Sequence, residues 1–168
     1  MKIVLIGFMG SGKTTVAATL ADKLKLKVFD MDKTALKKSN RSSINEIFEK
    51  DGEKTFREIE LEVAKEIGNK NNIVVSTGGG VVMDQKTMNY LLENTYVIYL
   101  KASFDRIKKR VALKKVRPPL FQNVISAKKL FDLREPLYEN YANLIIDTDE
   151  KSVDQVIKEI LKGLNGRK

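Results

Sequence analysis

The segment Gly7-Phe8-Met9-Gly10-Ser11-Gly12-Lys13-Thr14 decides the fold of this chain, because it follows the pattern G-x-x-x-x-G-K-[ST]. It comes directly after Ile3-Val4-Leu5-Ile6, an apolar run typical of a strand that is buried on both faces of a parallel sheet. A helical pattern comes next, with Val16, Leu20 and Leu24 at i, i+4 and i+8. A strand that passes through a glycine-rich turn into a helix is the context that the motif requires.

The residue types of this motif suit a triphosphate group. Glycine lets the backbone turn tightly, so that successive N–H groups point at phosphate oxygens, and the helix N-terminus adds further donors. Lys13 offers a cation to the β- and γ-phosphates, and Thr14 offers a hydroxyl to Mg²⁺, which prefers oxygen ligands. A chance glycine-rich turn is the alternative, but it does not explain why motif and context agree. The motif predicts a nucleoside triphosphate site and leaves the phosphoryl acceptor open.

Length and composition describe one globular domain. The chain has 168 residues, of which 42% are apolar and 32% are charged. These values are ordinary for a single domain and exclude collagen-like, disordered and disulfide-rich classes. Cys and His are absent, which excludes disulfides, thiolate metal sites, histidine triads and histidine-ligated zinc or haem. Any acid–base chemistry must therefore come from Asp, Glu, Lys, Tyr or Arg.

The charge balance is basic, with 31 Lys and Arg against 22 Asp and Glu, a formal net charge of +9. Such a balance fits nucleic acid, an anionic membrane surface or phosphorylated small molecules as partners. No apolar run approaches the roughly 18–20 residues that span a bilayer. The apolar start of the chain is interrupted from Gly7 onward, which is typical of a core strand rather than a signal peptide. We expect a cytoplasmic protein with no membrane partner.

Strand and helix patterns alternate along the chain. Apolar runs predict strands at residues 3–6, 28–29, 73–75, 96–100 and 144–146. Helical periodicity predicts further helices over about 53–67, 85–92, 103–113 and 153–161. Ser43 followed by Glu46 predicts a capping box before another short helix. This alternation predicts an α/β fold with a parallel sheet and helices on both faces.

Three of these strands end in residues that could bind a ligand, and in open parallel sheets ligands bind beyond the carboxyl ends of the strands. The first strand leads into the phosphate motif. The second ends at Asp30 and Asp32, which share one face if the segment is extended; one could act near a metal and the other as a general base. The alternative is a solvated turn in which an aspartate caps a helix beginning near Lys33. The third ends at Gly78-Gly79-Gly80, which suits a close approach of backbone to ligand, or a flexible turn.

Arginines at three places could bind anions. Arg57 and Arg134 each stand beside a glutamate, so a surface ion pair is the ordinary interpretation. The functional interpretation is a bidentate hydrogen bond to a carboxylate or phosphate. Residues 108–117 hold six Lys and Arg and run into Arg117-Pro118-Pro119. This stretch is either a solvated helix face or a mobile lid that closes cations over nucleotide phosphates.

Together these features resemble the shikimate kinase family, whose members are small phosphate-loop kinases related in fold to nucleoside monophosphate kinases. The resemblance covers nearly the whole chain. It rests on segments found in family order, namely Gly7 to Thr15, Asp30-Met31-Asp32, Phe56-Arg57, Ser76 to Gly80, Arg117-Pro118 and Arg134-Glu135-Pro136-Leu137-Tyr138. The first motif is shared by very many families, whereas the whole set is much more selective.

The resemblance implies a single kinase domain over residues 1–168, with a three-layer fold and a five-stranded parallel sheet of order 2-3-1-4-5. It also implies acceptor-binding helices over about 33–62 and a lid over about 111–124. The implied reaction is ATP-dependent phosphorylation of the 3-hydroxyl of shikimate, a step toward chorismate and the aromatic amino acids, with Mg²⁺ as cofactor.

Residue roles follow from the same resemblance. The implied catalytic residues are Asp32 as the candidate base, with Lys13 and Arg117 stabilising the transferring phosphoryl group. The implied ATP-binding residues are Gly10, Ser11, Gly12, Lys13, Thr14, Thr15, Arg110 and Arg117. The implied shikimate-binding residues are Asp32, Arg57, Gly78, Gly79, Gly80 and Arg134. Thr14, and Asp30 through water, would hold Mg²⁺.

One departure from the family and three alternatives complete the prediction. The family commonly has Leu where Pro119 stands, and a proline stiffens the loop and removes an N–H. A kinase for gluconate or a nucleoside monophosphate is the alternative enzyme. A regulatory GTPase is disfavoured because Asn69-Lys70-Asn71-Asn72 lacks the final carboxylate of a guanine-binding motif. Nucleic-acid binding is supported only by the net charge, since Trp is absent and aromatics are few. We expect a monomer that binds ATP and shikimate and no nucleic acid.

Overall fold

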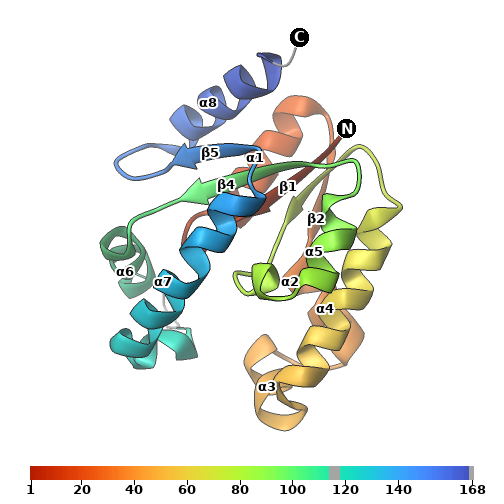
Figure 1. Ribbon diagram of the computed structural model, residues 1–168, viewed down its shortest axis with the longest axis vertical. Helices are drawn as coiled ribbons and strands as arrows, with labels where there is room; N and C mark the ends of the chain where they lie inside the picture. The colour runs from red at the N-terminus through yellow and green to blue at the C-terminus, as the bar shows by residue number, and fades with distance from the viewer. Residues whose placement is uncertain (114–117, 167–168) are drawn as a thin grey trace.

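The computed structural model describes residues 1–113 and 118–166 and forms eight α-helices, two short 3₁₀ helices and five strands (Figure 1). In chain order the elements are β1 (Lys2–Ile6), α1 (Lys13–Leu24), β2 (Lys27–Asp30), α2 (Met31–Ser39), α3 (Ile44–Lys50), α4 (Gly52–Gly68), β3 (Ile73–Ser76), η1 (Val81–Met83), α5 (Gln85–Leu92), β4 (Tyr96–Lys101), α6 (Phe104–Ala112), η2 (Pro119–Gln122), α7 (Val124–Tyr141), β5 (Leu144–Asp147) and α8 (Val153–Asn165).

The five strands form one parallel sheet in the order β2-β3-β1-β4-β5, which confirms the predicted fold and strand order. β1 lies at the centre, where Val4 is in register with Val75 on one side and with Val97 on the other. All five residues of β1 are buried, as expected of a parallel strand covered on both faces. The carboxyl end of β1 therefore lies between β3 and β4, at the edge of the sheet where ligands bind in such folds.

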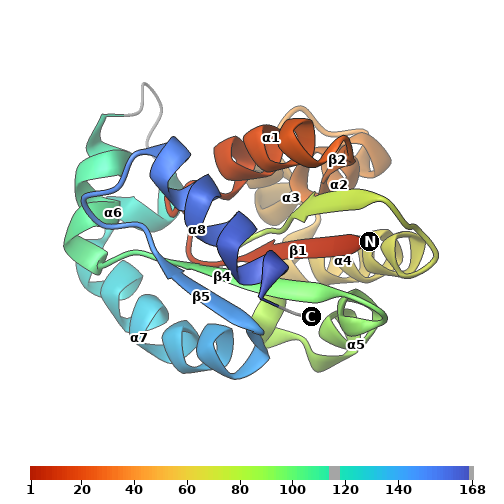
Figure 2. The same cartoon turned by 90° about the horizontal axis from the view of Figure 1, so that it is seen from above.

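Helices cover both faces of the sheet, which makes three layers (Figure 2). α1 and α8 lie on one face, where Leu5 and Ile98 of the sheet pack with Leu20 and Ile157. The helices α4, α5 and α7 lie on the other face, over a larger core that includes Val75, Phe56 and Tyr138 of those layers. The two apolar clusters fix the strand ends relative to the helices, because interiors are close-packed and deform little.

Two local features differ from the sequence-based expectation, and a third, the capping of a helix by an aspartate, matches its stated alternative. Asp32 lies in the first turn of α2, so the extended geometry considered for Asp30 and Asp32 is wrong. Asp30 instead caps this helix, and its Oδ1 accepts the backbone N–H of Lys33 at 3.0 Å. Ser43 caps α3, but the Glu46 carboxylate accepts the N–H of the preceding residue, so the capping box is incomplete.

Helix α7 was not predicted from the sequence. Pro136 lies inside this 18-residue helix, where proline removes one backbone hydrogen bond and is normally unfavourable. Its buried stripe also contains a charged residue, Arg134, beside Ala127, Phe131 and Tyr138. No helix among the described residues is long and apolar enough to cross a membrane.

Candidate active site

The loop between β1 and α1 has the geometry of a phosphate cradle. Gly10 and Gly12 have φ values of 84° and 97°, a backbone region that side chains rarely adopt. Gly12 is the N-cap of α1 and no side chain caps it, so the first N–H groups of the helix stay available to an anion. The Ser11 hydroxyl is buried in this loop and has no hydrogen-bond partner in the part of the chain that the structure describes, whereas Thr15 lies exposed in the first turn of α1.

Lys13 is folded back onto the loop. Its Nζ donates to the carbonyl oxygens of Gly7 at 2.7 Å and Phe8 at 3.1 Å. The ammonium group therefore sits in the concave face of the cradle, where the β- and γ-phosphates of a nucleotide bind in this motif. Phosphate oxygens can replace those carbonyls as acceptors when a nucleotide is present.

Hydroxyl groups from α1 and β3 meet next to the cradle. Thr14 Oγ1 lies 3.4 Å from the Oγ of Ser76, which is in register with Asp30 of β2. These residues offer hard oxygen donors, and Mg²⁺ takes few protein ligands when substrate phosphates and water complete its shell. Among the described residues there is no cluster of three carboxylates that could hold a metal without such help. The donor set therefore fits Mg²⁺ bound together with a nucleotide.

The three consecutive glycines after β3 each face a different part of the site. A Cβ on Gly78 would lie 2.8 Å from Asp32 Oδ1 and 3.0 Å from Glu60 Oε1. A Cβ on Gly79 would lie 3.2 Å from the backbone nitrogen of Met9 in the phosphate cradle. A Cβ on Gly80 would meet the guanidinium groups of Arg57 and Arg134. Side chains are excluded here because carboxylates, cradle and cations all approach this backbone.

The guanidinium groups of Arg57 and Arg134 converge on Gly80. A Cβ at this position would lie 2.7 Å and 2.9 Å from Nη2 and Nη1 of Arg57 and 3.2 Å from Nη2 of Arg134. The two arginines come from α4 and α7, which cover the same face of the sheet (Figure 2). Like charges this close repel one another, and the arrangement becomes favourable when an anion lies between them.

Arg57 is held by two carboxylates of its own helix. It donates to Glu60, one turn later, and to Glu53 at 3.2 Å. Burial disfavours the charged guanidinium, but the charges and hydrogen bonds of Glu60 and Glu53 outweigh it, and the pKa of Arg57 is raised. One half of the guanidinium is thus anchored on α4 while the group as a whole faces Gly80.

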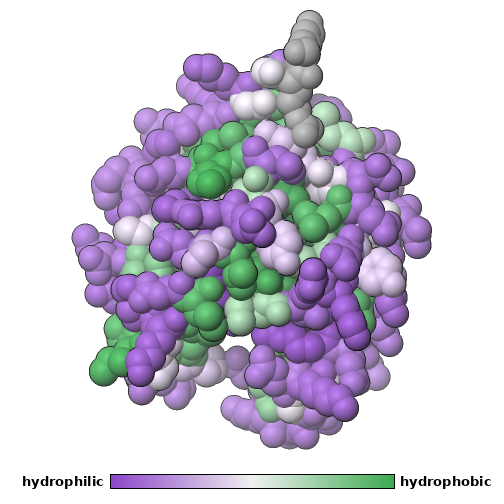
Figure 3. Space-filling view, in the orientation of Figure 1, coloured by the Kyte–Doolittle hydropathy of each residue, from purple (hydrophilic) through white to green (hydrophobic). Residues whose placement is uncertain are grey.

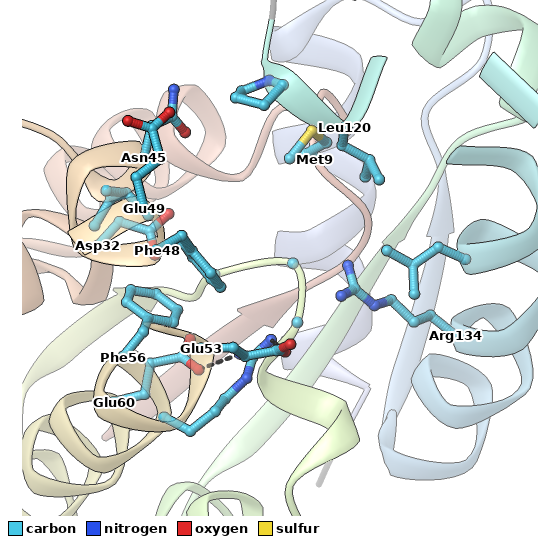
Figure 4. A pocket seen from close by; sticks show the side chains of 17 residues that line it. Met9, Asp32, Asn45, Phe48, Glu49, Glu53, Phe56, Glu60, Leu120 and Arg134 are labelled. Atoms are coloured by element: carbon cyan, nitrogen blue, oxygen red, sulfur yellow. Dashed lines mark hydrogen bonds and ion pairs between the residues drawn. The ribbon is translucent and has the colours of Figure 1, made fainter. Parts of the chain in front are cut away.

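Arg134 is buried, with 9% of its surface exposed, and its Nε has no hydrogen-bond partner among the described residues. Its guanidinium carbon lies 5.7 Å from the ring centroid of Phe8, in cation–π range. Burial lowers the pKa of Arg134, and the charge of Arg57 lowers it further. The side chain points into the cavity from the α7 side (Figure 4), so its positive charge faces the space where a ligand could bind.

Asp32 faces these cations across the cavity (Figure 4). It is open to solvent there, but protein on several sides displaces much of the surrounding water. This desolvation raises the pKa of Asp32, while the charges of Lys13 and Arg57 oppose the rise. An aspartate with a raised pKa beside a phosphate cradle has the properties of a general base.

The Asp32 and Arg134 side chains line one cavity of about 410 Å³. Figure 3 shows the molecule hollowed between α3 and the N-terminal part of α7, with apolar residues gathered around the hollow. Phe48 and Phe56 form an apolar wall, with ring centroids 4.7 Å apart. The remaining lining residues are Met9, Ile44, Asn45, Glu49, Glu53, Arg57, Glu60, Gly78, Gly79, Gly80, Pro119, Leu120 and Leu130. The two guanidinium groups near Gly80 suit an anionic group of a ligand, and the phenyl rings suit an apolar part of it.

Arg110, another predicted residue, is not among the residues that line this cavity. Arg110 of α6 donates to the backbone oxygen of Thr148 at 2.8 Å and lies 3.4 Å from the carbonyl oxygens of Gly10 and Ser11. It therefore connects the cradle to the loop after β5. Residues 114–117 of the predicted lid over 111–124, Arg117 included, lie outside the described residues. In the rest of that segment, η2 places Pro119 and Leu120 in the cavity wall.

Asp30, like the predicted ATP-binding residues of the phosphate loop and Arg110, does not line the cavity. Its carboxylate caps α2 and lies at the strand end beside Ser76. Several lining residues were not among the predicted site residues, Glu60 and Phe48 among them. Glu60 was detectable, because it falls in the buried stripe of α4 with Phe56 and Val63, where a carboxylate is unusual.

The parallel sheet, the phosphate cradle and the adjoining anion cavity define a phosphate-loop kinase of small molecules. A family model described as shikimate kinase matches residues 9–165. The shikimate kinase of Sulfurihydrogenibium sp. is 39% identical over 98% of each chain, and that of Enterococcus faecalis is 42% identical over 96% of this chain and 97% of its own. The chain belongs to the shikimate kinase family.

Solved structures agree with this assignment. The shikimate kinase from Acinetobacter baumannii in complex with shikimate has a TM-score of 0.92 at 31% identity, over 99% of this chain and 94% of its own. The enzyme from Aquifex aeolicus has a TM-score of 0.82 at 36% identity, over 99% and 97%. A gluconokinase from Sinorhizobium meliloti has a TM-score of 0.68 at 16% identity, over 98% and 91%, and so shares the fold alone.

Proposed function

We propose that this chain transfers the γ-phosphoryl group of ATP to the 3-hydroxyl of shikimate, giving shikimate 3-phosphate and ADP. The observation that carries the proposal is the convergence of Arg57 and Arg134 on Gly80, in the same cavity as Asp32 and next to the phosphate cradle. Two guanidinium groups match a carboxylate, and an aspartate matches a ring hydroxyl. The acceptor must therefore carry both groups.

The apolar wall favours a cyclic acceptor. Phe48 is 38% exposed and Phe56 is buried behind it, so an aromatic face is presented to the cavity. The C–H face of a cyclohexene ring can cover this surface, whereas an open-chain polyol such as gluconate would place hydroxyls against it. This contact favours shikimate over the alternative acceptors.

In the proposed reaction Asp32 accepts the proton of the acceptor hydroxyl. The oxygen of that hydroxyl forms a bond to the γ-phosphorus at the same time. The bond from that phosphorus to the β–γ bridging oxygen breaks, and ADP leaves. Lys13 neutralises the charge that develops on the transferred group, and the cradle N–H groups and the helix N-terminus hold the β-phosphate. Arg117 is proposed to add a second cation over the phosphates.

When bound, Mg²⁺ neutralises phosphate charge, and we propose Thr14, with Asp30 through water, as the residues that hold it. Ser11, Gly12, Thr15 and Arg110 are proposed to contact the nucleotide at its phosphates or near its base. Every group that the reaction needs comes from one chain, and we propose that the enzyme acts as a monomer.

ATP turnover with and without shikimate, in the presence of Mg²⁺, tests this proposal. Gluconate and a nucleoside monophosphate are run in parallel, and the phosphorylated product is identified by ³¹P NMR. We expect rapid turnover with shikimate alone and a phosphate ester at its 3-position. Faster turnover with another acceptor would overturn the assignment.

A further inference from the structure

The proposed reaction gives no role to Tyr138, the last residue of the Arg134–Tyr138 segment. Tyr138 lies one helical turn after Arg134, so both side chains project from the same face of α7. The Tyr138 side chain is fully buried, although tyrosine usually keeps its hydroxyl in water. A buried hydroxyl requires partners, and these define what the residue can do.

The Tyr138 hydroxyl interacts with two of the residues that line the cavity, Gly79 and Arg134. It donates a hydrogen bond of 2.5 Å to the carbonyl oxygen of Gly79. Its oxygen also interacts favourably with the guanidinium of Arg134. Burial raises the pKa of Tyr138 well above that of a free phenol, so the proton stays on the hydroxyl and the donor role is permanent at neutral pH.

Gly79 is the glycine that packs against the phosphate cradle. A Cβ on Gly79 would lie 3.2 Å from the backbone nitrogen of Met9 and 3.6 Å from the Gly7 oxygen. The position of its peptide group therefore sets the separation between the cradle and the acceptor cavity. A 1 Å error in such a separation is costly for group transfer, because the reacting atoms must be aligned.

The geometry points to Tyr138 as a positioning residue. Its hydroxyl fixes the Gly79 peptide and the Arg134 guanidinium relative to each other, so that the guanidinium is in place to bind the acceptor carboxylate. This inference rests on the proposed function, since it concerns how the same acceptor site keeps its shape. Arg134 has a buried Nε with no hydrogen-bond partner among the described residues, so few other polar contacts there fix its guanidinium. The ring of Tyr138 is itself fixed by stacking on Tyr99, with centroids 5.1 Å apart.

The test is the variant Tyr138→Phe, which removes the hydroxyl and keeps the stacked ring. We expect the KM for shikimate to rise about tenfold, the size of one lost hydrogen bond to a charged group, while kcat and the KM for ATP change less than about threefold. Tyr99→Phe is the matched control, because it deletes a hydroxyl from the neighbouring buried ring, which has no contact with the glycine loop among those described. This control should leave all three constants within about twofold.

A double-mutant cycle separates positioning from general stability. In an Arg134→Gln background, Tyr138→Phe should raise the KM for shikimate much less than in the wild type, since the guanidinium that it orients is gone. Equal penalties in the two backgrounds, or an unchanged KM in the single variant, would overturn the inference. If the wild type itself does not phosphorylate shikimate, the proposed function fails instead, so the two failures are distinguishable.

A measurement on the wild-type enzyme covers the case in which Tyr138→Phe does not fold. The chain has five tyrosines, so labelling their ζ carbons with ¹³C gives a short NMR spectrum, in which Tyr→Phe variants of the other four identify Tyr138. Saturating shikimate should move the Tyr138 resonance, and ATP alone should leave it in place. A resonance that shikimate does not move would contradict the positioning role.

Discussion

Asp32, the proposed general base, has an environment that favours this role at the expense of stability. Its carboxylate is desolvated in the cavity, which raises its pKa. The pKa of Glu60 is raised for the same reason. The folded protein therefore keeps Asp32 protonated to a higher pH than the unfolded chain does. Folding takes up a proton in that window, so the free energy of unfolding contributed by this group falls as pH rises through it.

Asp32→Asn should therefore stabilise the protein without ligands. Asparagine resembles the protonated aspartate, so the melting temperature at pH 7 should exceed that of the wild type, and the difference should shrink toward about pH 4. Thermal unfolding across this pH range measures it. A variant that melts lower than the wild type at pH 7 would show that the carboxylate stabilises the fold.

The same substitution should abolish most catalysis. Loss of a general base reduces kcat by about 10²–10⁴-fold, while the cradle still binds ATP. Steady-state kinetics together with ATP titration separate the two effects, and near-normal turnover would reject the base role.

Arg57→Ala and Arg134→Ala should act on the acceptor rather than on ATP. Each removes a charged hydrogen bond worth roughly 1.5–3 kcal/mol, which corresponds to about a 10- to 150-fold higher KM for shikimate. The KM for ATP serves as the internal control. An unchanged shikimate KM in either variant would count against the carboxylate grip.

At the scale of elements, the loop after β3 connects the phosphate cradle with the cavity beside it. Gly79 packs on backbone of the phosphate cradle, whereas Gly80 packs on the ends of flexible arginine side chains. Backbone cannot move aside as a side chain can, so the two glycines differ in what they tolerate. The same holds for η2, which lines the cavity and is anchored by Phe121 against Phe8 and Phe104.

Gly79→Ala should raise the KM for both ATP and shikimate, because its methyl group pushes on the cradle. Gly80→Ala should raise the KM for shikimate alone, because its methyl group displaces the two guanidinium groups. Full kinetics with both substrates measure this difference. Equal effects of the two substitutions on ATP would contradict the division of roles between the two glycines.

Phe121→Ala should destabilise the protein by about 3 kcal/mol, the cost of removing a buried phenyl ring. Phe121 is 7% exposed, whereas nearby Ile125 is 71% exposed. Ile125→Ala is therefore the control and should change the free energy of unfolding by less than about 0.5 kcal/mol. Chemical denaturation measures both, and equal effects would mean that Phe121 does not anchor η2.

The whole molecule carries a net charge of +9, and ATP and shikimate are both anionic. Such a field attracts both substrates over distances that salt screens, since the Debye length falls from about 30 Å at 0.01 M to about 3 Å at 1 M. We expect kcat/KM for both substrates to fall several-fold as NaCl rises over this range, with a smaller change in kcat. A kcat/KM that salt leaves unchanged would show that the charge has no part in substrate capture.

At this scale, much of the fold could be predicted from the sequence. The parallel strands are continuous apolar runs, and helices such as α5 have regular periodicity, so local patterns were sufficient. Helix α7 could not be predicted because Pro136 and a buried arginine break the pattern of an amphipathic helix. Its stability comes from tertiary packing, which no local window contains.

The site was predictable in part. The phosphate motif is contiguous, and its chemistry follows from residue types and spacing. The meeting of Arg57 and Arg134 at Gly80 joins three distant segments, and only the family resemblance placed them together in advance. The extended geometry considered for Asp30 and Asp32 was wrong. Asp30 caps α2, which begins at the next residue, so Asp32 lies in the first helical turn.

The most direct test of the account is a crystal structure of this chain with shikimate and a non-hydrolysable ATP analogue. We predict the shikimate carboxylate between the guanidinium groups of Arg57 and Arg134 beside Gly80, and the 3-hydroxyl within hydrogen-bond distance of Asp32, facing the γ-phosphate at Lys13. Shikimate bound elsewhere, or turned so that its carboxylate lies away from both arginines, would contradict it.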